Sequence, residues 1–180
     1  EAGIVVTNQA TGGPVGKSLA LLPDDINNDG WVDVVVANDT VRNFLFLNQQ
    51  DGTFVEVGEA RGLAFDAGGL ATGAMGIDSA WFSNDPRKGI AIGNFANEMS
   101  SFYVSRGTAN TFSDDAVVAG IGAPSRRTLT FGLLFLDLNL DGREDLLAAA
   151  RLREPSVPAD YILHHAAAET VPMTLRAPSA

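Results

Sequence analysis

Two nine-residue segments of this 180-residue chain share one pattern, and their spacing constrains the fold more than any other feature. The segments are 25–33 (DINNDGWVD) and 137–145 (DLNLDGRED). Each has an oxygen-bearing side chain at positions 1, 3, 5 and 9 and a glycine at position 6. Midway between them along the chain, the segment 81–89 (WFSNDPRKG) has lost most of these side chains. The pattern predicts a repeat protein with a period of about 56 residues.

The spacing of the oxygen atoms in the two segments suits a hard cation. Ca²⁺ binds six to eight oxygens, and a tight loop with alternate side chains turned inward supplies several of them from one short segment. The predicted side-chain ligands are Asp25, Asn27, Asp29 and Asp33 in the first loop and Asp137, Asn139, Asp141 and Asp145 in the second. At position 7, where the backbone carbonyl would coordinate, the loops have Trp31 and Arg143. The sequence therefore predicts two Ca²⁺ sites.

Electrostatics favours metal binding over a bare turn, although Asp, Asn and Gly are also ordinary turn residues. Carboxylates held about 5 Å apart repel by about 3 kcal/mol per pair at an effective dielectric constant of roughly 20. The loops are not EF-hands, because position 12 is Val36 or Ala148 instead of glutamate. The segment 81–89 keeps Asp85 but has Arg87 and Lys88 beside it, so it is expected to bind no ion.

The charge of the chain fits this interpretation and excludes some partners. The formal net charge is −10 and the pI about 4.4, which argues against nucleic acid as a partner. Two bound Ca²⁺ would bring the charge to −6. The sequence has no cysteine and no apolar stretch of the roughly 18 residues that a membrane span needs. Loops of this kind indicate a secreted, periplasmic or cell-surface protein, because weak sites are filled by extracellular calcium.

Each repeat is predicted to form four short antiparallel strands. Hydrophobic runs and turn signals place them at 16–22, 32–37, 43–48 and 53–57 in the first repeat, and at 74–82, 89–94, 101–105 and 111–117 in the second. The third repeat matches from 129 through its loop to 145–150. The closing phrases 60–64 (ARGLA) and 118–123 (VAGIGA) also correspond.

Strands that are apolar on both faces favour the blades of a β-propeller over a sandwich or a barrel, because each blade covers its neighbour. The expected architecture is all-β, with about two complete blades and part of a third. The repeats lie near 5–64, 65–123 and 124–152. The opening phrase 1–4 (EAGI) resembles the closing phrases, so we expect either a fragment of a closed propeller or an open arc.

The segments 16–65 and 131–150 resemble FG-GAP/VCBS repeats, the units of integrin-α-type propellers. They are most similar to the bacterial ASPIC/UnbV-associated branch that resembles cartilage acidic protein. The resemblance covers residues 1–152 and implies a seven-bladed type of propeller, calcium in hairpin loops, export and a non-catalytic binding or scaffolding role. It assigns ligand roles only to the eight Asp and Asn side chains named above.

The C-terminal segment 153–180 contains proline and no repeat phrase, so we expect either an extended arm that docks on a partner or a disordered or artificial end. His164 and His165 lie in this arm, and solvated side chains are expected there more than metal ligands.

No nucleophile lies beside a base in the sequence, so we expect no enzyme activity. The predicted function is a calcium-binding interaction module, acting as a scaffold or accessory subunit of an exported or membrane-associated assembly. Protein partners are expected to cover the exposed blade faces and the C-terminal arm. The alternative is a fragment of a propeller-containing enzyme whose catalytic residues lie outside this segment.

Overall fold

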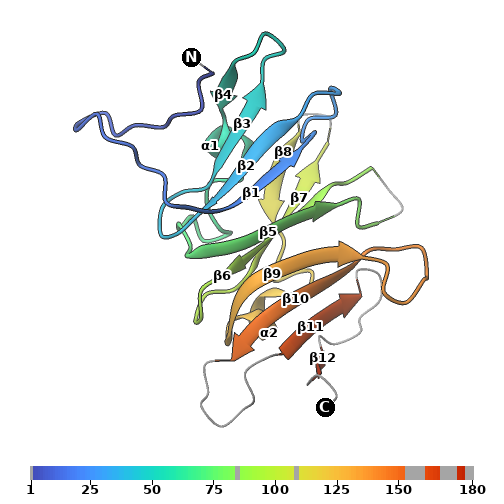
Figure 1. Ribbon diagram of the computed structural model, residues 1–180. Helices are drawn as coiled ribbons and strands as arrows, with labels where there is room; N and C mark the ends of the chain where they lie inside the picture. The colour runs from blue at the N-terminus through green and yellow to red at the C-terminus, as the bar shows by residue number, and fades with distance from the viewer. Residues whose placement is uncertain (1, 84–85, 108–109, 153–160, 167–173, 177–180) are drawn as a thin grey trace.

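The computed structural model describes residues 2–83, 86–107, 110–152, 161–166 and 174–176. Within these residues the chain forms three antiparallel sheets of four strands each, which follow one another along the molecule (Figure 1). The first sheet contains β1 (Ser18–Asp24), β2 (Asp33–Asn38), β3 (Phe44–Asn48) and β4 (Phe54–Glu56). The second contains β5 (Ala74–Ala80), β6 (Gly89–Asn94), β7 (Ser101–Arg106) and β8 (Thr111–Asp114). The third contains β9 (Thr128–Leu136), β10 (Asp145–Leu152), β11 (Tyr161–Ala166) and β12 (Thr174–Arg176).

This architecture confirms the predicted all-β fold of blade-like sheets. Neighbouring strands in the chain are also neighbours in each sheet, so every sheet is a simple meander. The predicted strand 89–94 coincides with β6, whereas β8 ends at Asp114, before the predicted end at 117. The strand stops there because the Asp114 carboxylate accepts the N–H of Ala116 at 3.1 Å, which turns the chain away from the sheet.

The C-terminal segment differs from the expected arm where the structure describes it. Most of 153–180 lies outside the described residues, but β11 pairs antiparallel with β10, and β12 with β11. His164 and His165 lie in β11, in register with Leu147 and Leu146. A repeat phrase is therefore not needed for these strands to join the sheet, because β10 offers a backbone edge to β11, and β11 offers one to β12.

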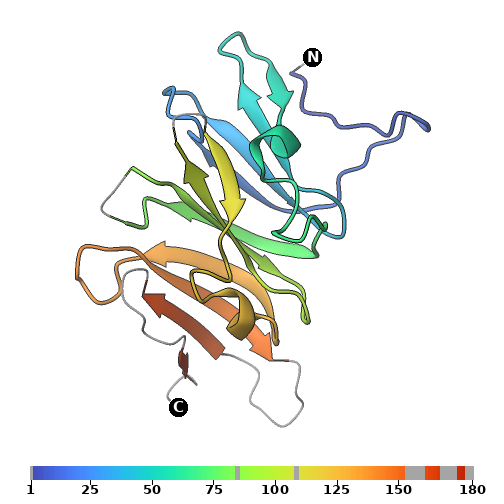
Figure 2. The same cartoon turned by 180° about the vertical axis from the view of Figure 1, so that it is seen from behind.

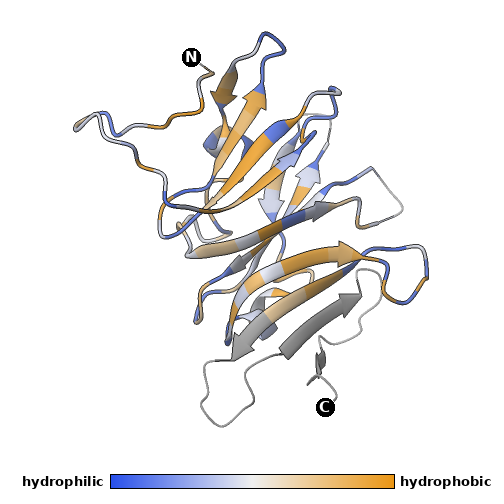
Figure 3. Ribbon diagram, viewed as in Figure 1, coloured by the Kyte–Doolittle hydropathy of each residue, from blue (hydrophilic) through white to orange (hydrophobic). Residues whose placement is uncertain are grey.

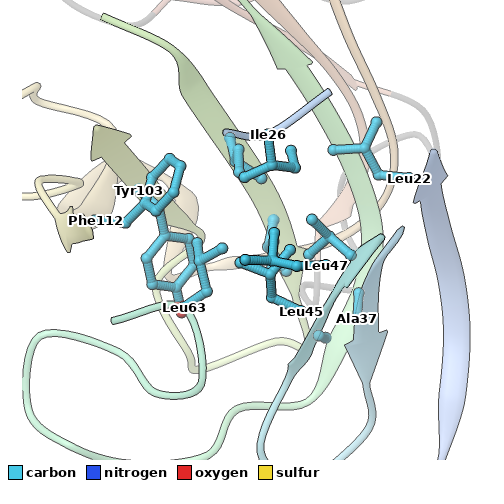
Figure 4. Packing of buried hydrophobic residues seen from close by; sticks show 12 residues of the cluster. Leu22, Ile26, Ala37, Leu45, Leu47, Leu63, Tyr103 and Phe112 are labelled. Carbon is cyan, nitrogen blue, oxygen red and sulfur yellow. The ribbon is translucent and has the colours of Figure 1, made fainter. Parts of the chain in front are cut away.

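The central strands are buried on both faces, as their uninterrupted apolar sequences predict. In β2, Val35 joins the core between the first two sheets, while Val36 packs on the opposite face with Phe44 and Phe46. Figure 3 shows the apolar residues concentrated along β2 and β3. Figure 4 shows Leu45 gathered with residues of the second sheet in the first of these cores.

The second sheet separates two cores. Ile90 and Tyr103 face the first sheet, whereas Phe102 and Val104 belong to the core shared with Phe135 of the third sheet. The aromatic pair Phe82 and Phe102 stacks edge to face within this second core, with ring centroids 5.0 Å apart. Alternate residues of one strand therefore stabilise two different interfaces.

Backbone atoms of the second and third sheets approach closely at two glycines. A Cβ atom at Gly76 would lie 1.9 Å from the carbonyl oxygen of Phe131, and one at Gly93 would lie 2.5 Å from that of Thr130. Contacts this short exclude any side chain. The two sheets can pack at this distance only because both positions are glycine.

Two short helices follow the outermost strands of the first and second sheets, α1 (Gly58–Arg61) and α2 (Gly122–Ser125) (Figure 2). After α1, Gly62 adopts a left-handed conformation with φ of 79°. Its Cβ position lies 2.3 Å from the carbonyl oxygen of Phe112 in β8. Gly3 has the same conformation, and its Cβ position lies 2.5 Å from the carbonyl of Phe54 in β4. The opening phrase thus occupies on the first sheet the place that a closing phrase occupies on the second.

Candidate functional site

The first aspartate-rich loop connects β1 to β2 and is held by its own side chains. Asp25 Oδ1 accepts the N–H of Asp29 at 3.0 Å, and Asp25 Oδ2 accepts that of Gly30 at 2.8 Å. Asn27 Oδ1 accepts the same Asp29 N–H at 3.0 Å, so oxygens from positions 1 and 3 converge on one atom. Gly30 has φ of 88°, which glycine adopts without a steric penalty. The loop therefore turns at the predicted position.

The second loop, between β9 and β10, repeats this network. Asp137 accepts the N–H groups of Asp141 and Gly142 at 3.0 and 2.8 Å, the same two distances as in the first loop. Asn139 Oδ1 lies 2.9 Å from the Asp141 nitrogen, where the first loop has 3.0 Å, and Gly142 has φ of 84°. The repeat seen in the sequence is therefore also a repeat of geometry.

Positions 5 and 7 are also linked in the same way in both loops. The carboxylates of Asp29 and Asp141 each accept the backbone N–H of the residue two positions later, Trp31 and Arg143, at 2.9 Å. The hydrogen bond from Trp31, followed by the one from Asn27, lowers the pKa of Asp29 below its usual value. Asp29 is therefore ionised, as a ligand for a cation must be.

Position 9 anchors each loop to its sheet. Asp33 is completely buried at the start of β2, where its two oxygens accept the N–H groups of Ile26 at 3.0 Å and Asn48 at 2.8 Å. Burial raises the pKa of Asp33, although these two hydrogen bonds oppose the shift. Asp145 is likewise buried and accepts the N–H of Leu138 at 3.1 Å.

The side chains present fit a hard cation by their chemistry, since each loop offers three carboxylates and one amide oxygen. The oxygens of positions 1 and 3 already lie together, whereas the position 9 carboxylate is engaged with backbone N–H groups. Within the described part of the chain, no three Asp, Glu, His or Cys side chains are grouped closely enough to hold a metal ion. An ion would therefore require the loop carboxylates to move toward it.

Residues 25–85, from the first loop to the degenerate one, match the protein-family model described as an FG-GAP-like repeat. This chain carries an FG-GAP-like repeat. No curated protein matches the chain. FG-GAP repeats are typically non-catalytic units of β-propeller-type interaction modules, and they are common in extracellular or surface proteins.

Lys88, at the end of the degenerate segment 81–89, contacts the first loop. Residues 84–85, including Asp85, lie outside the described residues. Lys88 follows them and is 4% exposed. Its ammonium donates to Asp24 Oδ2 at 2.8 Å and to the carbonyl of Asp25 at 2.6 Å, and lies 5.1 Å from the Trp81 ring centroid. The second sheet thus brings a positive charge to the edge of the first loop.

Two further amide side chains brace the first loop. Asn110, in the turn between β7 and β8, donates to the carbonyl of Asn27 at 2.8 Å. Gln50 donates to Asp29 Oδ2 at 3.3 Å. The sequence predicted none of these contacts, because Lys88 and Asn110 lie 63 and 83 residues from the residues whose carbonyls they bind.

Proposed function

We propose that this chain is a calcium-binding, non-catalytic interaction module of the β-propeller type, acting as a scaffold or accessory subunit of a larger exported or membrane-associated assembly. The observation that carries the proposal is the repetition of one hydrogen-bond network in two loops that belong to different sheets. Each loop concentrates acidic oxygens at the same end of a blade-like sheet, which is chemistry that Ca²⁺ satisfies and a plain turn does not require.

Two calcium ions are proposed, one in each intact loop. The proposed ligands share the positions 1, 3, 5, 7 and 9 of the loop: Asp25, Asn27, Asp29, the Trp31 carbonyl and Asp33, and Asp137, Asn139, Asp141, the Arg143 carbonyl and Asp145. Ion binding would neutralise part of the charge of −10 and link each loop to the strand that follows it. At free calcium ten times Kd, each ion would add about 1.4 kcal/mol to the free energy of unfolding.

Calcium titration of the EGTA-treated protein by isothermal calorimetry tests the proposed sites. We expect two equivalents for the unmodified chain, and one each for Asp29→Ala and Asp141→Ala. Asp51→Ala, which changes the same charge in the turn between β3 and β4, should keep two. Absence of binding heat together with a melting temperature that does not respond to EGTA would refute the calcium sites.

The proposed interaction role is supported by apolar side chains on the outer faces of the stack. Leu19 and Leu21 of β1 are exposed on the face opposite the first core, and Phe131 and Leu134 of β9 are exposed on the third sheet. Apolar residues gathered on a sheet face are typical of surfaces that another protein covers. In a complex isolated with the intact chain, replacing Leu19 and Leu21 by serine should weaken binding of the partner. Unchanged binding would exclude this face of β1 as the binding surface.

An exported location follows from the same proposal. FG-GAP repeats are common in surface proteins, and weak calcium sites are filled where free calcium is high. The two helices in the described part of the chain have four residues each, which is too short to span a membrane. Detection of the natural protein only in the cytoplasm would contradict the proposed location.

A further inference from the structure

A groove separate from the aspartate-rich loops lies along the connections between the sheets. Its larger part has a volume of about 540 Å³ and is bounded by the segment before β5, the turn between β6 and β7, and the segment after β8. Its smaller part, about 370 Å³, lies beside α1. The two parts share Asp66, Ala67 and Asp114 in their linings, so they adjoin one another. Two adjoining depressions suit a segment of chain that places a side chain in each.

Carboxylates dominate the charge of the groove. Its lining includes four of them, Glu59, Asp66, Glu98 and Asp114, and one guanidinium, Arg126. The formal charge is therefore −3. A partner with basic groups complements it, whereas nucleic acids and phosphorylated ligands are repelled.

Two of these carboxylates have an oxygen open to a ligand. Asp66 uses Oδ1 to accept the N–H groups of Gly68 and Leu70 at 2.9 and 2.8 Å, and Glu98 uses Oε2 to accept that of Gly73 at 2.6 Å. Within the described residues, Asp66 Oδ2 and Glu98 Oε1 accept no hydrogen bond, and neither is a buried unsatisfied atom. Neither oxygen is fully buried, so each can accept from an incoming cationic group.

The groove walls are fixed before any partner arrives. Asp66 and Leu70 exchange hydrogen bonds that close a turn, and Ala67 donates to Asp114 Oδ2 at 3.3 Å, which ties this turn to the end of β8. Apolar side chains border the groove, with Leu70 66% and Val118 88% exposed. A rigid groove with apolar margins reduces the entropy cost of binding and gives the apolar part of a peptide a contact surface.

The carboxylates of the groove are spread along it. In the described part of the chain no three acidic side chains converge on one point, so the charges are distributed along the groove. Distributed charges match basic side chains that recur along an extended strand, where every second residue lies on the same face.

From this geometry we infer that the groove binds an extended segment of a partner protein whose basic side chains alternate with apolar ones. The inference rests on the proposed interaction function and identifies its surface and partner chemistry. The groove lies at the start of β5, whereas the aspartate-rich loops follow the ends of β1 and β9. Peptide binding and calcium binding therefore use opposite ends of the sheets.

Fluorescence anisotropy with a labelled nonapeptide of alternating valine and arginine tests this surface. We expect saturable binding, about three- to fivefold weaker for Asp66→Asn and for Glu98→Gln, since each removes one exposed ion pair. The same peptide with citrulline in place of arginine keeps its shape without charge and should bind at least tenfold more weakly. Asp51→Asn, the matched change outside the groove, should bind as the unmodified chain does.

Val118→Lys is a second test that does not depend on the folding of Asp66→Asn. Val118 is almost fully exposed, so its replacement should not disturb the fold. A positive charge at this margin should weaken arginine-peptide binding about threefold without changing the melting temperature. Equal binding of the citrulline peptide, no effect of Val118→Lys, or absence of binding would overturn the inference. Arginine-peptide binding that is insensitive to every groove variant would place the interaction elsewhere, and would leave the broader interaction function standing.

Discussion

Lys88 donates a hydrogen bond of 2.8 Å to the carboxylate of Asp24, across the boundary between the second sheet and the first. Ser79 donates to the same Asp24 oxygen at 2.7 Å. The ammonium also binds the Asp25 carbonyl and lies over the Trp81 ring. A buried lysine is stable only when its donors are satisfied, and here two oxygens and an aromatic face surround it. The pair joins two blade-like sheets.

Lys88→Met should lower the free energy of unfolding by about 2–3 kcal/mol, because it leaves the partly buried Asp24 without its counter-charge. Chemical denaturation of Lys88→Met, Asp24→Asn and the double variant measures the coupling. We expect the double variant to recover at least about 1 kcal/mol relative to the sum of the single changes. Additive effects within about 0.5 kcal/mol would show that the pair does not join the sheets.

Asn110→Ala tests the brace between the second sheet and the first loop. Loss of the hydrogen bond to the Asn27 carbonyl should cost about 1 kcal/mol of stability. Native-state hydrogen exchange should show faster exchange of the Asp29 and Gly30 amides, which the loop side chains protect. Gln9→Ala, an exposed change in the segment before β1, should leave both amides unchanged. Unaltered exchange of the loop amides in Asn110→Ala would show that Asn110 does not stabilise the loop.

Gly76→Ala should destabilise the interface between the second and third sheets. The added methyl group would meet the Phe131 carbonyl at 1.9 Å, and backbone cannot yield as a flexible side chain does. We expect a loss of about 3 kcal/mol by equilibrium denaturation. Gly13→Ala, where the nearest atom is 3.6 Å away and φ is not positive, should change stability by less than about 0.5 kcal/mol. Equal effects of both substitutions would contradict the close packing.

Tyr103 makes stability depend on alkaline pH. The side chain is fully buried, its hydroxyl donates to the Phe65 carbonyl at 3.0 Å, and burial raises the pKa of the phenol. The folded-state pKa therefore exceeds the unfolded value of about 10, so this contribution is complete below about pH 10 and is lost as the pH rises further.

Comparison with Tyr103→Phe isolates that effect from other titrating groups. At pH 8 the variant should be about 1 kcal/mol less stable, since it lacks the hydrogen bond. The difference should shrink between about pH 10 and 12 as the unfolded tyrosine ionises. A difference that stays constant over this range, measured by urea denaturation, would show that the phenol titrates normally when folded.

The parts of this structure that are local in sequence could be predicted, and the parts that join distant segments could not. The turn positions of Gly30 and Gly142 and the strand 89–94 follow from spacing and turn chemistry. The contacts of Lys88 and Asn110 depend on how two sheets pack, which no spacing within one repeat encodes. The same holds for the groove, whose walls come from three separate connections.

The strands β11 and β12 show a second limit of prediction from the sequence. Their sequences share no phrase with the other repeats, so periodicity gave no reason to expect sheet pairing there. Pairing with β10 depends on a free backbone edge, and many sequences satisfy that requirement. Repeat analysis detects recurring turns better than it detects outer strands.

Gly62 has a consequence for how such proteins can be cut and recombined. Gly62 follows the last strand of the first sheet but packs against β8, the outermost strand of the second sheet. The unit that can be exchanged between proteins therefore does not coincide with one four-stranded sheet. A chimera joined midway between two sheets would leave the Phe112 carbonyl without its cover. The junction has to lie before the closing segment that contains Gly62. Each transferred sheet then keeps the segment of the preceding repeat that packs on its outermost strand.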